Sequence, residues 1–368
     1  MRPVRLGIIG CGAIAQVQHL PNLAALREEF SVEVVCDASA GLARAVAEHF
    51  HVPRAVSDYR DVLAADVEAV VLCHTDPKTR VALDAFAAGK HVFIEKPVCF
   101  SVEAADALVE AQQAARTVGL AGYMKVYDPA FELALAAVRR LKTVRFVQIH
   151  HYHTDNSHHL AQFRLHRAAD LPDAAREASR VARAAELRQA IGDVAPAVEG
   201  AFFRLAGSVI HDLYGLRHLA GPAKRVLHTE LWNEGWGINA LLELEGGARS
   251  AVTWVELRSV RDFKETLEVC CDDGRVLLSY PTGFARGILS TVSVQDLDAE
   301  GHPVAHQPAV AWDSPFVREL RHFHACIRSG ADPHTPLSAA RHDVALIADI
   351  VRTYLLAQTS LAAQETRA

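Results

Sequence analysis

The sequence predicts an α/β protein of two domains, the first built on a parallel sheet and the second, an α+β domain, on an open and mainly antiparallel sheet. The chain of 368 residues is long enough for two domains of roughly 150 residues each. Over the first third, short apolar runs alternate with Ala-rich segments of helical periodicity, as in a parallel sheet with helices on both faces. After Gly122, longer segments alternate between apolar and polar residues, as in an antiparallel sheet with one covered face.

The first domain is expected over residues 1–122. Its strands are predicted at 4–9, 31–36, 69–73, 91–94 and 119–122. The helices between them are predicted near 13–29, 40–50, 77–88 and 101–116. Strands and helices that alternate in this way form a doubly wound sheet of the Rossmann type.

The second domain is expected over residues 123–368 and begins with a helix at 129–141. Its strands are predicted at 143–153, 225–233, 237–245, 248–257, 263–270 and 274–279. Residues 155–205 fit neither pattern and are interpreted as an insertion, whose amphipathic helix at 173–191 is a solvated surface helix, a lid or a subunit contact. Two amphipathic helices, at 315–329 and 338–357, form a closing segment (315–357) that packs against a domain face.

Composition and charge exclude several classes of protein. Hydrophobic residues make up 50% of the chain and charged residues 22%, which excludes collagen-like and disordered chains. The formal net charge of −6 argues against a nucleic-acid partner. No apolar run approaches the roughly 18 residues of a membrane span, and Met1 leads directly into a strand pattern, so a cytoplasmic protein without a membrane partner is expected. The 7 cysteines form no C-x-x-C pair and are expected to be reduced and buried.

A glycine-rich turn follows the first strand. Residues 10–15 read Gly-Cys-Gly-Ala-Ile-Ala, a G-x-G-x-x-A sequence that opens a helix. The first Gly permits a tight turn, the second lets a pyrophosphate approach the backbone, and the final Ala allows close packing of helix and strand. Gly10, Gly12, Ala13 and Ile14 are therefore predicted to bind a dinucleotide pyrophosphate at the positive end of the helix.

Asp37 follows the second strand. An acidic side chain at this place accepts hydrogen bonds from the ribose hydroxyls and repels a 2′-phosphate, so the sequence predicts NAD as the cofactor in preference to NADP. In the alternative interpretation, the glycines serve only a tight turn and Asp37 caps the next helix.

The next two strands also end in polar residues. His74 and Thr75 follow one of them, and Glu95-Lys96-Pro97 follows the other. Ligands of such sheets bind at the carboxyl edge, so His74, Thr75, Glu95 and Lys96 are predicted to face the cofactor. The alternative for Glu95 and Lys96 is a surface ion pair, which contributes little.

These motifs together closely resemble the Gfo/Idh/MocA family of oxidoreductases, named for glucose-fructose oxidoreductase and inositol dehydrogenase. The resemblance rests on the glycine turn and on Glu95-Lys96-Pro97 after the run G-K-H-V at 89–92. It continues in the run G-Y-M-K-V-Y-D-P at 122–129, in V-I-H-D-L at 209–213 and in the closing helices, so it covers nearly the whole chain outside the insertion.

The resemblance implies a dehydrogenase that forms a dimer or tetramer and whose second domain presents a polyol to the nicotinamide. It implies that Lys96 contacts the reacting oxygen, that the peptide before Pro97 is cis, and that His211 is catalytic. The residue chemistry agrees, because imidazole has an ordinary pKa near neutrality and can take the hydroxyl proton while an ammonium stabilises the alkoxide. The alternative for His211 is a core histidine.

One position departs from the family pattern. Inositol dehydrogenase-like members carry an Asp four residues before the His, and this chain has Gly207 there. The missing carboxylate leaves open what fixes the tautomer of His211. Asp212, Tyr127 or a carboxylate from the insertion are the candidates.

The densest polar cluster lies at 150–159 and contains His153 and Asp155. No closed set of four convergent ligands is recognisable there, so no metal site is predicted. His153 and Asp155 are instead expected to reach a polyhydroxylated substrate, or to be solvated. Lys125, Tyr127 and Asp212, which lie in the segments resembling the family, complete the predicted substrate site.

The sequence therefore predicts an NAD(P)-dependent oxidoreductase, with NAD favoured, that transfers hydride between the cofactor and a secondary alcohol or ketone of a sugar, cyclitol or related polyol. Lys96 and His211 are the expected catalytic residues. Two alternatives stay open. One is a redox-neutral sugar lyase or glycosidase that keeps its NAD, and the other is a non-catalytic NAD or sugar sensor, which would need neither a base nor an alkoxide partner.

Overall fold

The computed structural model describes residues 2–75 and 77–365, and the chain forms two compact units. The first unit comprises Met1–Met124, Leu160–Gly192 and Phe316–Val344. The second comprises Lys125–His159, Asp193–Pro315 and Ala345–Ala368. Much of the interpreted insertion and the first closing helix thus lie in the first unit, whereas the sequence analysis placed both after the boundary at residue 122.

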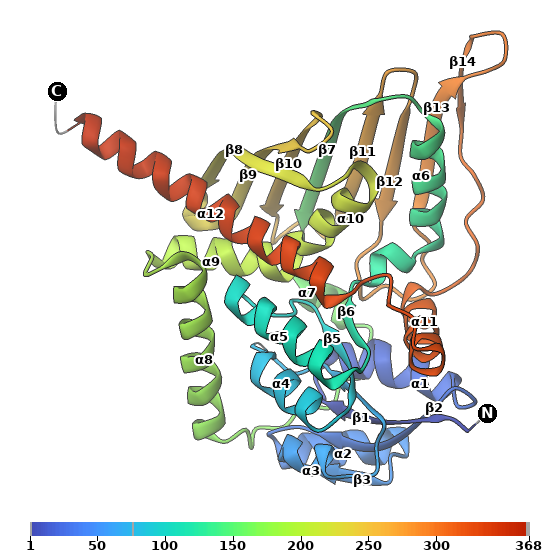
Figure 1. Cartoon of the computed structure of the whole chain (residues 1–368), viewed down its shortest axis with the longest axis vertical. Coiled ribbons are helices and arrows are strands. Elements are labelled where there is room, and N and C mark those ends of the chain that lie inside the picture. Colours follow the sequence, from blue (N-terminus) through green and yellow to red (C-terminus); the bar gives the residue numbers. More distant parts are fainter. Residues whose placement is uncertain (1, 76, 366–368) are drawn as a thin grey trace. The chain divides into compact units, whose positions relative to one another are not determined.

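Within the described residues, the first unit contains a six-stranded parallel sheet in the order β3-β2-β1-β4-β5-β6 (Figure 1). Its strands are β1 (Val4–Ile9), β2 (Phe30–Cys36), β3 (Arg54–Val56), β4 (Ala69–Leu72), β5 (His91–Glu95) and β6 (Gly119–Gly122). This order is that of a Rossmann sheet, which confirms the predicted fold class. β3 was not predicted from the sequence, because its three residues are all partly exposed and form no apolar run.

The helices of the first unit begin and end at recognisable signals. Ser39 and Ser101 are the N-caps of α2 and α5, and their hydroxyls accept the N–H groups of Leu42 and Ala104. A π-helical turn, Ala15–His19, leads into α1. The helices are α1 (Leu20–Ala25), α2 (Ala40–Phe50), α3 (Tyr59–Leu63), α4 (Thr79–Ala87), α5 (Val102–Ala115), α8 (Asp173–Ile191) and α11 (Pro315–Ser329).

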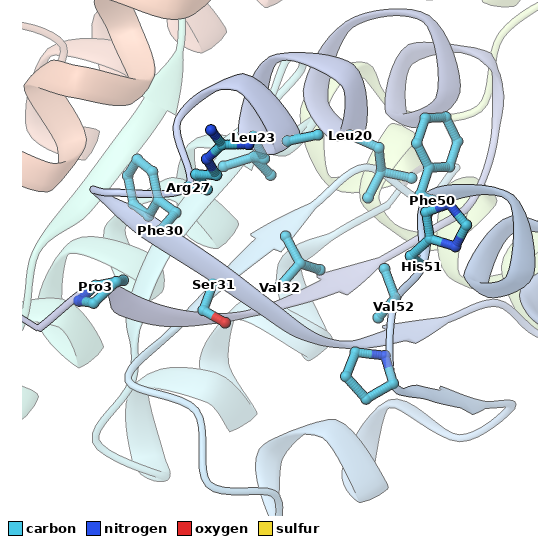
Figure 2. A pocket seen from close by; sticks show the side chains of 12 residues that line it. Pro3, Leu20, Leu23, Arg27, Phe30, Ser31, Val32, Phe50, His51 and Val52 are labelled. Atoms are coloured by element: carbon cyan, nitrogen blue, oxygen red, sulfur yellow. The ribbon is translucent and has the colours of Figure 1, made fainter.

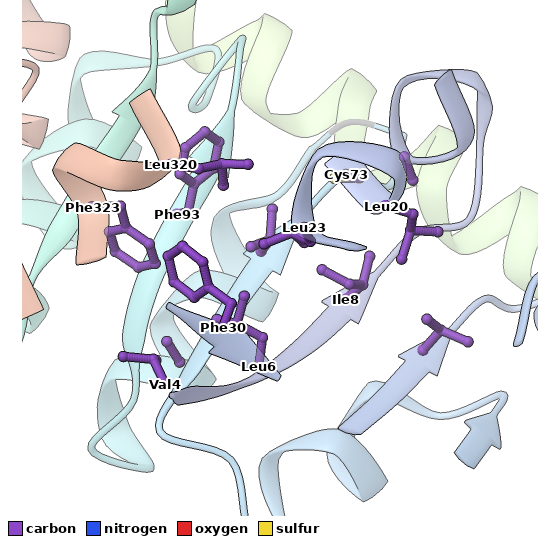
Figure 3. Packing of buried hydrophobic residues seen from close by; sticks show 14 of the residues in the cluster. Val4, Leu6, Ile8, Leu20, Leu23, Phe30, Cys73, Phe93, Leu320 and Phe323 are labelled. Atoms are coloured by element: carbon purple, nitrogen blue, oxygen red, sulfur yellow. The ribbon is translucent and has the colours of Figure 1, made fainter. Parts of the chain in front are cut away.

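A buried hydrophobic cluster attaches α11 to the parallel sheet (Figure 3). Leu320 and Phe323 of α11 pack with Phe30 of β2 and Phe93 of β5, and all four are at most 2% exposed. The rings of Phe93 and Phe323 meet edge to face with their centroids 5.8 Å apart. This packing explains why a helix near the end of the chain belongs to the first unit.

Within the described residues, the second unit contains an eight-stranded sheet in the order β14-β13-β12-β11-β7-β10-β9-β8. Neighbouring strands are antiparallel except β7 and β10, which are parallel. The strands are β7 (Val144–His153), β8 (Ala223–Trp232), β9 (Gly237–Leu244), β10 (Arg249–Glu256), β11 (Lys264–Cys271), β12 (Arg275–Tyr280), β13 (Thr291–Leu297) and β14 (Pro303–His306). The open, mainly antiparallel sheet is confirmed, and β13 and β14 were not predicted.

Helices of the second unit pack on this sheet. α10 (Ile210–Ala220) contacts β7 and β11, and α6 (Pro129–Arg140) contacts β12 and β13. The unit also contains α7 (Asn156–Leu160) and α9 (Pro196–Arg204), and α12 (Leu337–Glu365) begins in the first unit and ends here. Among the described residues, no helix is both long enough and apolar enough to cross a membrane.

Candidate active site

The glycine turn of the first unit has the two properties that a phosphate-binding loop needs. Gly10 adopts a positive φ of 100°, and its N–H donates to the carbonyl of Cys36 at 2.7 Å. A Cβ on Gly10 would lie 2.2 Å from the backbone nitrogen of His74, so only glycine fits there. A Cβ on Gly12 would meet nothing within 4 Å, and the helix begins at Ala13 and Ile14 directly after it. The backbone of Gly12 is thus open to a ligand at the start of a helix.

Asp37 lies beside this turn and is held by two backbone groups. One carboxylate oxygen accepts the N–H of Cys11 at 2.9 Å, and the other accepts the N–H of Ser39 at 2.9 Å. Each carboxylate oxygen has a second lone pair, so these bonds leave acceptor capacity for a ribose hydroxyl. The carboxylate therefore links the glycine turn to the start of α2.

His74 and Thr75 follow β4, as the sequence predicts. Both ring nitrogens of His74 are buried and have no hydrogen-bond partner among the described residues. Burial lowers the pKa of His74 to about 3, so its imidazole is neutral at physiological pH. Thr75 is exposed. Unpartnered nitrogens at the carboxyl edge, together with the open backbone of Gly12, fit a polar cofactor bound at this edge.

The Glu95-Lys96-Pro97 turn is anchored from inside the first unit. Glu95 is 5% exposed, and its carboxylate lies 2.6 Å from Nε2 of the fully buried His19. Burial raises the pKa of Glu95, but the hydrogen bond to His19 and the charge of Lys96 outweigh this effect and lower it. The Lys96–Pro97 peptide is cis, as the resemblance implied. Glu95 is thus placed to hold the turn that carries Lys96, which is itself half-buried.

His19 was missed by the sequence analysis, because nothing in a histidine of an amphipathic helix indicates a buried partner 76 residues away in sequence.

In the second unit, His211 has a phenol as its partner. Its Nδ1 lies 2.7 Å from the hydroxyl of Tyr214, one turn along α10. The same hydroxyl accepts the backbone N–H of Lys125 at 3.3 Å. Tyr214 is fully buried, so its hydroxyl holds a set position beside the imidazole. The hydroxyl of Tyr214 is thus a partner of the His211 imidazole in a chain that has Gly207 in place of the carboxylate.

A π-helical turn, Leu205–Val209, precedes α10. Turns of this kind occur frequently at functional sites. Gly207 lies within it, is exposed, and has open space at its Cβ position.

A continuous network of hydrogen bonds connects His151 with Asp212, Ser208 and Trp254. Nδ1 of His151 is 2.7 Å from a carboxylate oxygen of Asp212, and its Nε2 is 3.2 Å from the hydroxyl of Ser208. The indole of Trp254 donates to the same hydroxyl at 3.0 Å. With Nδ1–H donating to Asp212, Ser208 donates to Nε2 and every donor in the network is used. These hydrogen bonds connect the start of α10 to β7 and β10.

Two further charged side chains, Lys125 and Glu265, are buried in the second unit. The ammonium of Lys125 contacts a carboxylate oxygen of Glu265, and both side chains are at most 3% exposed. One ligand atom from each of His151, Asp212 and Glu265 lies within 4.8 Å of the others, close enough to share a metal ion. The ammonium of Lys125 supplies positive charge beside these two carboxylates.

The predicted substrate residues fall in different environments. Lys125, Tyr127 and Asp212 are buried, at 3%, 5% and 0% exposure. His153 is half-buried, and its ring stacks on Trp254 with centroids 5.8 Å apart. Asp155 is exposed and accepts the N–H of Ser157 at 2.8 Å, at the start of α7. Lys125 and Asp212 thus lie in the buried network of hydrogen bonds and ion pairs. His153 is more accessible than His151, which is buried.

Replacing Asp212 by Asn is expected to flatten the pH dependence of stability. Burial raises the pKa of Asp212 to about 7, so the folded protein binds more protons than the unfolded chain from about pH 4 to 7. The contribution of this group to the free energy of unfolding is present in full at low pH. It is lost, by up to about 1.4 kcal/mol per pH unit, as the pH rises through this window. Urea unfolding of both proteins across the window measures the slope, and parallel profiles would contradict the assignment.

A cavity of about 320 Å³ lies elsewhere in the first unit (Figure 2). Its lining includes Leu20, Leu23 and Arg27 of the α1 region, Phe30 at the amino end of β2, and Val52. Dinucleotides bind at the carboxyl ends of the strands, so this mainly apolar cavity is not the cofactor site.

Known proteins resemble this chain most clearly in its first domain. Residues 4–123 match the Gfo/Idh/MocA family model, described as an oxidoreductase family with an NAD-binding Rossmann fold. An inositol 2-dehydrogenase of Klebsiella pneumoniae (strain 342) is 37% identical over 139 residues, which is 37% of this chain and 41% of that protein. One from Acidothermus cellulolyticus is 35% identical over 133 residues, or 35% of this chain and 39% of that protein. The aligned region thus spans about two fifths of the length of these relatives.

Solved structures share the fold over most of the chain. A levoglucosan dehydrogenase in complex with NADH aligns with a TM-score of 0.73 at 16% identity, covering 95% of this chain and 96% of that chain. A 3-ketoreductase from Actinomadura kijaniata in complex with NADP aligns with a TM-score of 0.71 at 17% identity, covering 95% and 97%. Residues 4–123 are therefore similar to the NAD-binding Rossmann domain of the Gfo/Idh/MocA oxidoreductases, and the solved structures share the fold of nearly the whole chain.

Proposed function

We propose that this protein is an NAD-dependent dehydrogenase that transfers hydride between its cofactor and a secondary alcohol or ketone of a sugar, cyclitol or related polyol. The observation that carries the proposal is the glycine turn, in which Gly10 is sterically required and the backbone of Gly12 is open at a helix start. The names of the relatives, inositol 2-dehydrogenase and levoglucosan dehydrogenase, support the substrate class. The first unit then serves as the nucleotide-binding domain and the second as the substrate domain.

The cofactor would be held by residues at the carboxyl edge of the parallel sheet. The backbone of Gly12, Ala13 and Ile14 suits the pyrophosphate, and Asp37 suits the adenine ribose, which favours NAD over NADP. His74 and Thr75 would face the nicotinamide half. When bound, the nicotinamide supplies hydride chemistry, accepting or returning the hydride of the substrate carbon.

His211 is proposed as the general base for the substrate hydroxyl. The phenol oxygen of Tyr214 has two lone pairs, so it can accept both the N–H of Lys125 and an Nδ1–H of His211. This arrangement leaves the lone pair of the base on Nε2, which takes the proton. Lys96, held in place by Glu95 and His19, would stabilise the alkoxide that forms.

Tyr214→Phe is expected to lower kcat by about 2- to 10-fold, the effect of losing one neutral hydrogen bond. Without the phenol oxygen, the protonated imidazole loses an acceptor, so the pKa that governs the pH profile should fall and the profile should move to lower pH. Measurement of kcat against pH tests this, with Tyr354→Phe of α12 as the matched control. An unshifted profile would remove Tyr214 from its positioning role.

The proposed function is tested by following NADH absorbance while purified protein and NAD are challenged with inositols, aldoses, anhydrosugars and sugar acids. A rising signal with one class supports the dehydrogenase and identifies its substrate. A flat trace across the panel would count against it. If cofactor were then released on denaturation, redox-neutral catalysis or a sensor role would become the better explanation. The dimer or tetramer and the cytoplasmic location stay predictions.

A further inference from the structure

A segment of the interpreted insertion runs along the cofactor edge of the first unit. We call residues 161–172, between α7 and α8, the strap. The strap is attached to the helix that follows the glycine turn by a reciprocal pair of hydrogen bonds. The N–H of His166 donates to the side-chain oxygen of Gln16 at 2.8 Å, and the side-chain nitrogen of Gln16 donates to the carbonyl of His166 at 3.1 Å. Gln16 also donates to the carbonyl of Cys11, at 2.7 Å. The strap thus lies beside the dinucleotide loop.

The strap also reaches the start of α2 through Asp170. One carboxylate oxygen of Asp170 accepts the hydroxyl of Ser39, and the other accepts the N–H of Gly41 at 2.7 Å. These bonds, in that order, lower the pKa of Asp170, so it is ionised at neutral pH. The negatively charged carboxylate of Asp170 therefore accepts hydrogen bonds from donors at the N-terminal end of α2.

Asp37 is bound to the same turn, because it accepts the N–H of Ser39 at 2.9 Å. Two carboxylates, one from the end of β2 and one from the strap, thus meet at Ser39. In Rossmann domains this turn lies beside the 2′ position of the adenine ribose, where NADP carries its additional phosphate. The hydroxyl of Ser39 and the N–H of Gly41 are donors that such a phosphate would use, and Asp170 already uses them.

We infer that Asp170 is a specificity-determining residue that excludes NADP. The inference rests on the proposed function, since it requires that a nicotinamide dinucleotide binds this edge. Asp170 acts in two ways. It takes the donors at Ser39 and Gly41, and its charge repels a 2′-phosphate. Arg44, one turn into α2, is an exposed cation whose charge also acts on Asp170. With Asp170 removed, Ser39, Gly41 and Arg44 together form a site for that phosphate.

The test measures the Kd of NADH and of NADPH by fluorescence titration for the wild type, Asp170→Ala and Asp170→Asn. Asp170→Ala is expected to tighten NADPH binding by about 10-fold or more, and to change the Kd of NADH by less than about 3-fold. Asp170→Asn removes the charge and retains the shape, so it should give part of the gain. High salt should reduce the gain, because the repulsion is screened.

Asp173→Asn is the matched control, since Asp173 is an exposed carboxylate at the start of α8. An equal gain in this control would show a general effect of net charge and would overturn the inference. Wild-type NADH binding with no gain for NADPH in either Asp170 variant would also overturn it, while leaving the proposed function intact. Failure of the wild type to bind either dinucleotide would instead reject the proposed function.

Discussion

Replacing His211 by alanine is expected to lower kcat by about 10²- to 10⁴-fold, the usual contribution of a positioned general base. The substrate hydroxyl then has no proton acceptor at the point where hydride leaves its carbon. His211 belongs to the second unit and the glycine turn to the first, so the Kd of NADH should stay within about 2-fold. Steady-state kinetics and NADH titration together separate the two effects.

His302→Ala is the matched control for this prediction, because His302 is an exposed histidine of the same unit. It should leave kcat unchanged. A variant at His211 with wild-type turnover would leave the histidine as a structural residue and would require another base. A variant that lost NADH affinity as severely as turnover would indicate a change in the cofactor site rather than in proton transfer.

Gly10→Ala is expected to lose several kcal/mol of unfolding free energy and, with it, cofactor binding. The added Cβ would lie 2.2 Å from the nitrogen and 2.4 Å from the Cα of His74, which are backbone atoms that cannot rotate away. The φ of 100° is also a conformation that alanine adopts only under strain. Steric overlap and strain together place the loss at about 3–5 kcal/mol, which thermal or urea unfolding measures.

Gly12→Ala provides the comparison for this prediction. Its Cβ meets nothing within 4 Å, so the variant should unfold at the wild-type temperature. The same Cβ would project where a pyrophosphate approaches, so NADH affinity should fall by about 10-fold or more. A stable Gly10→Ala protein would contradict the steric argument. A Gly12→Ala protein with wild-type NADH affinity would contradict the placement of the pyrophosphate.

The sequence predicted the elements whose patterns are local. β1, β2, β4, β5 and β6 are short, buried strands, so each appears as an apolar run between helical segments. α8 was predicted at the residues it occupies, from its amphipathic periodicity. β14 was missed because all four of its residues are exposed, and no apolar pattern marks such an edge strand.

In the candidate site too, the features predicted from the sequence are those with a local pattern. The glycine turn, Asp37 and the Glu95-Lys96-Pro97 turn were found because each motif lies within a few residues of sequence. Tyr214 could also have been predicted from the sequence, since its spacing of three residues from His211 places both on one helix face. The candidates drawn from the sequence were instead Asp212, Tyr127 and a carboxylate of the insertion, so Tyr214 was not predicted.

The sequence by itself therefore determined the Rossmann fold and the glycine turn, since both depend on neighbouring residues and backbone geometry, and the family resemblance indicated the candidate catalytic residues. Only the tertiary structure decided what holds these residues in place. Lys125 and Glu265 are 140 residues apart, and Ser39 and Asp170 are 131 apart. No periodicity connects such pairs, because a buried ion pair or a cap from a distant segment depends on how whole elements pack, and packing is decided by the entire chain at once.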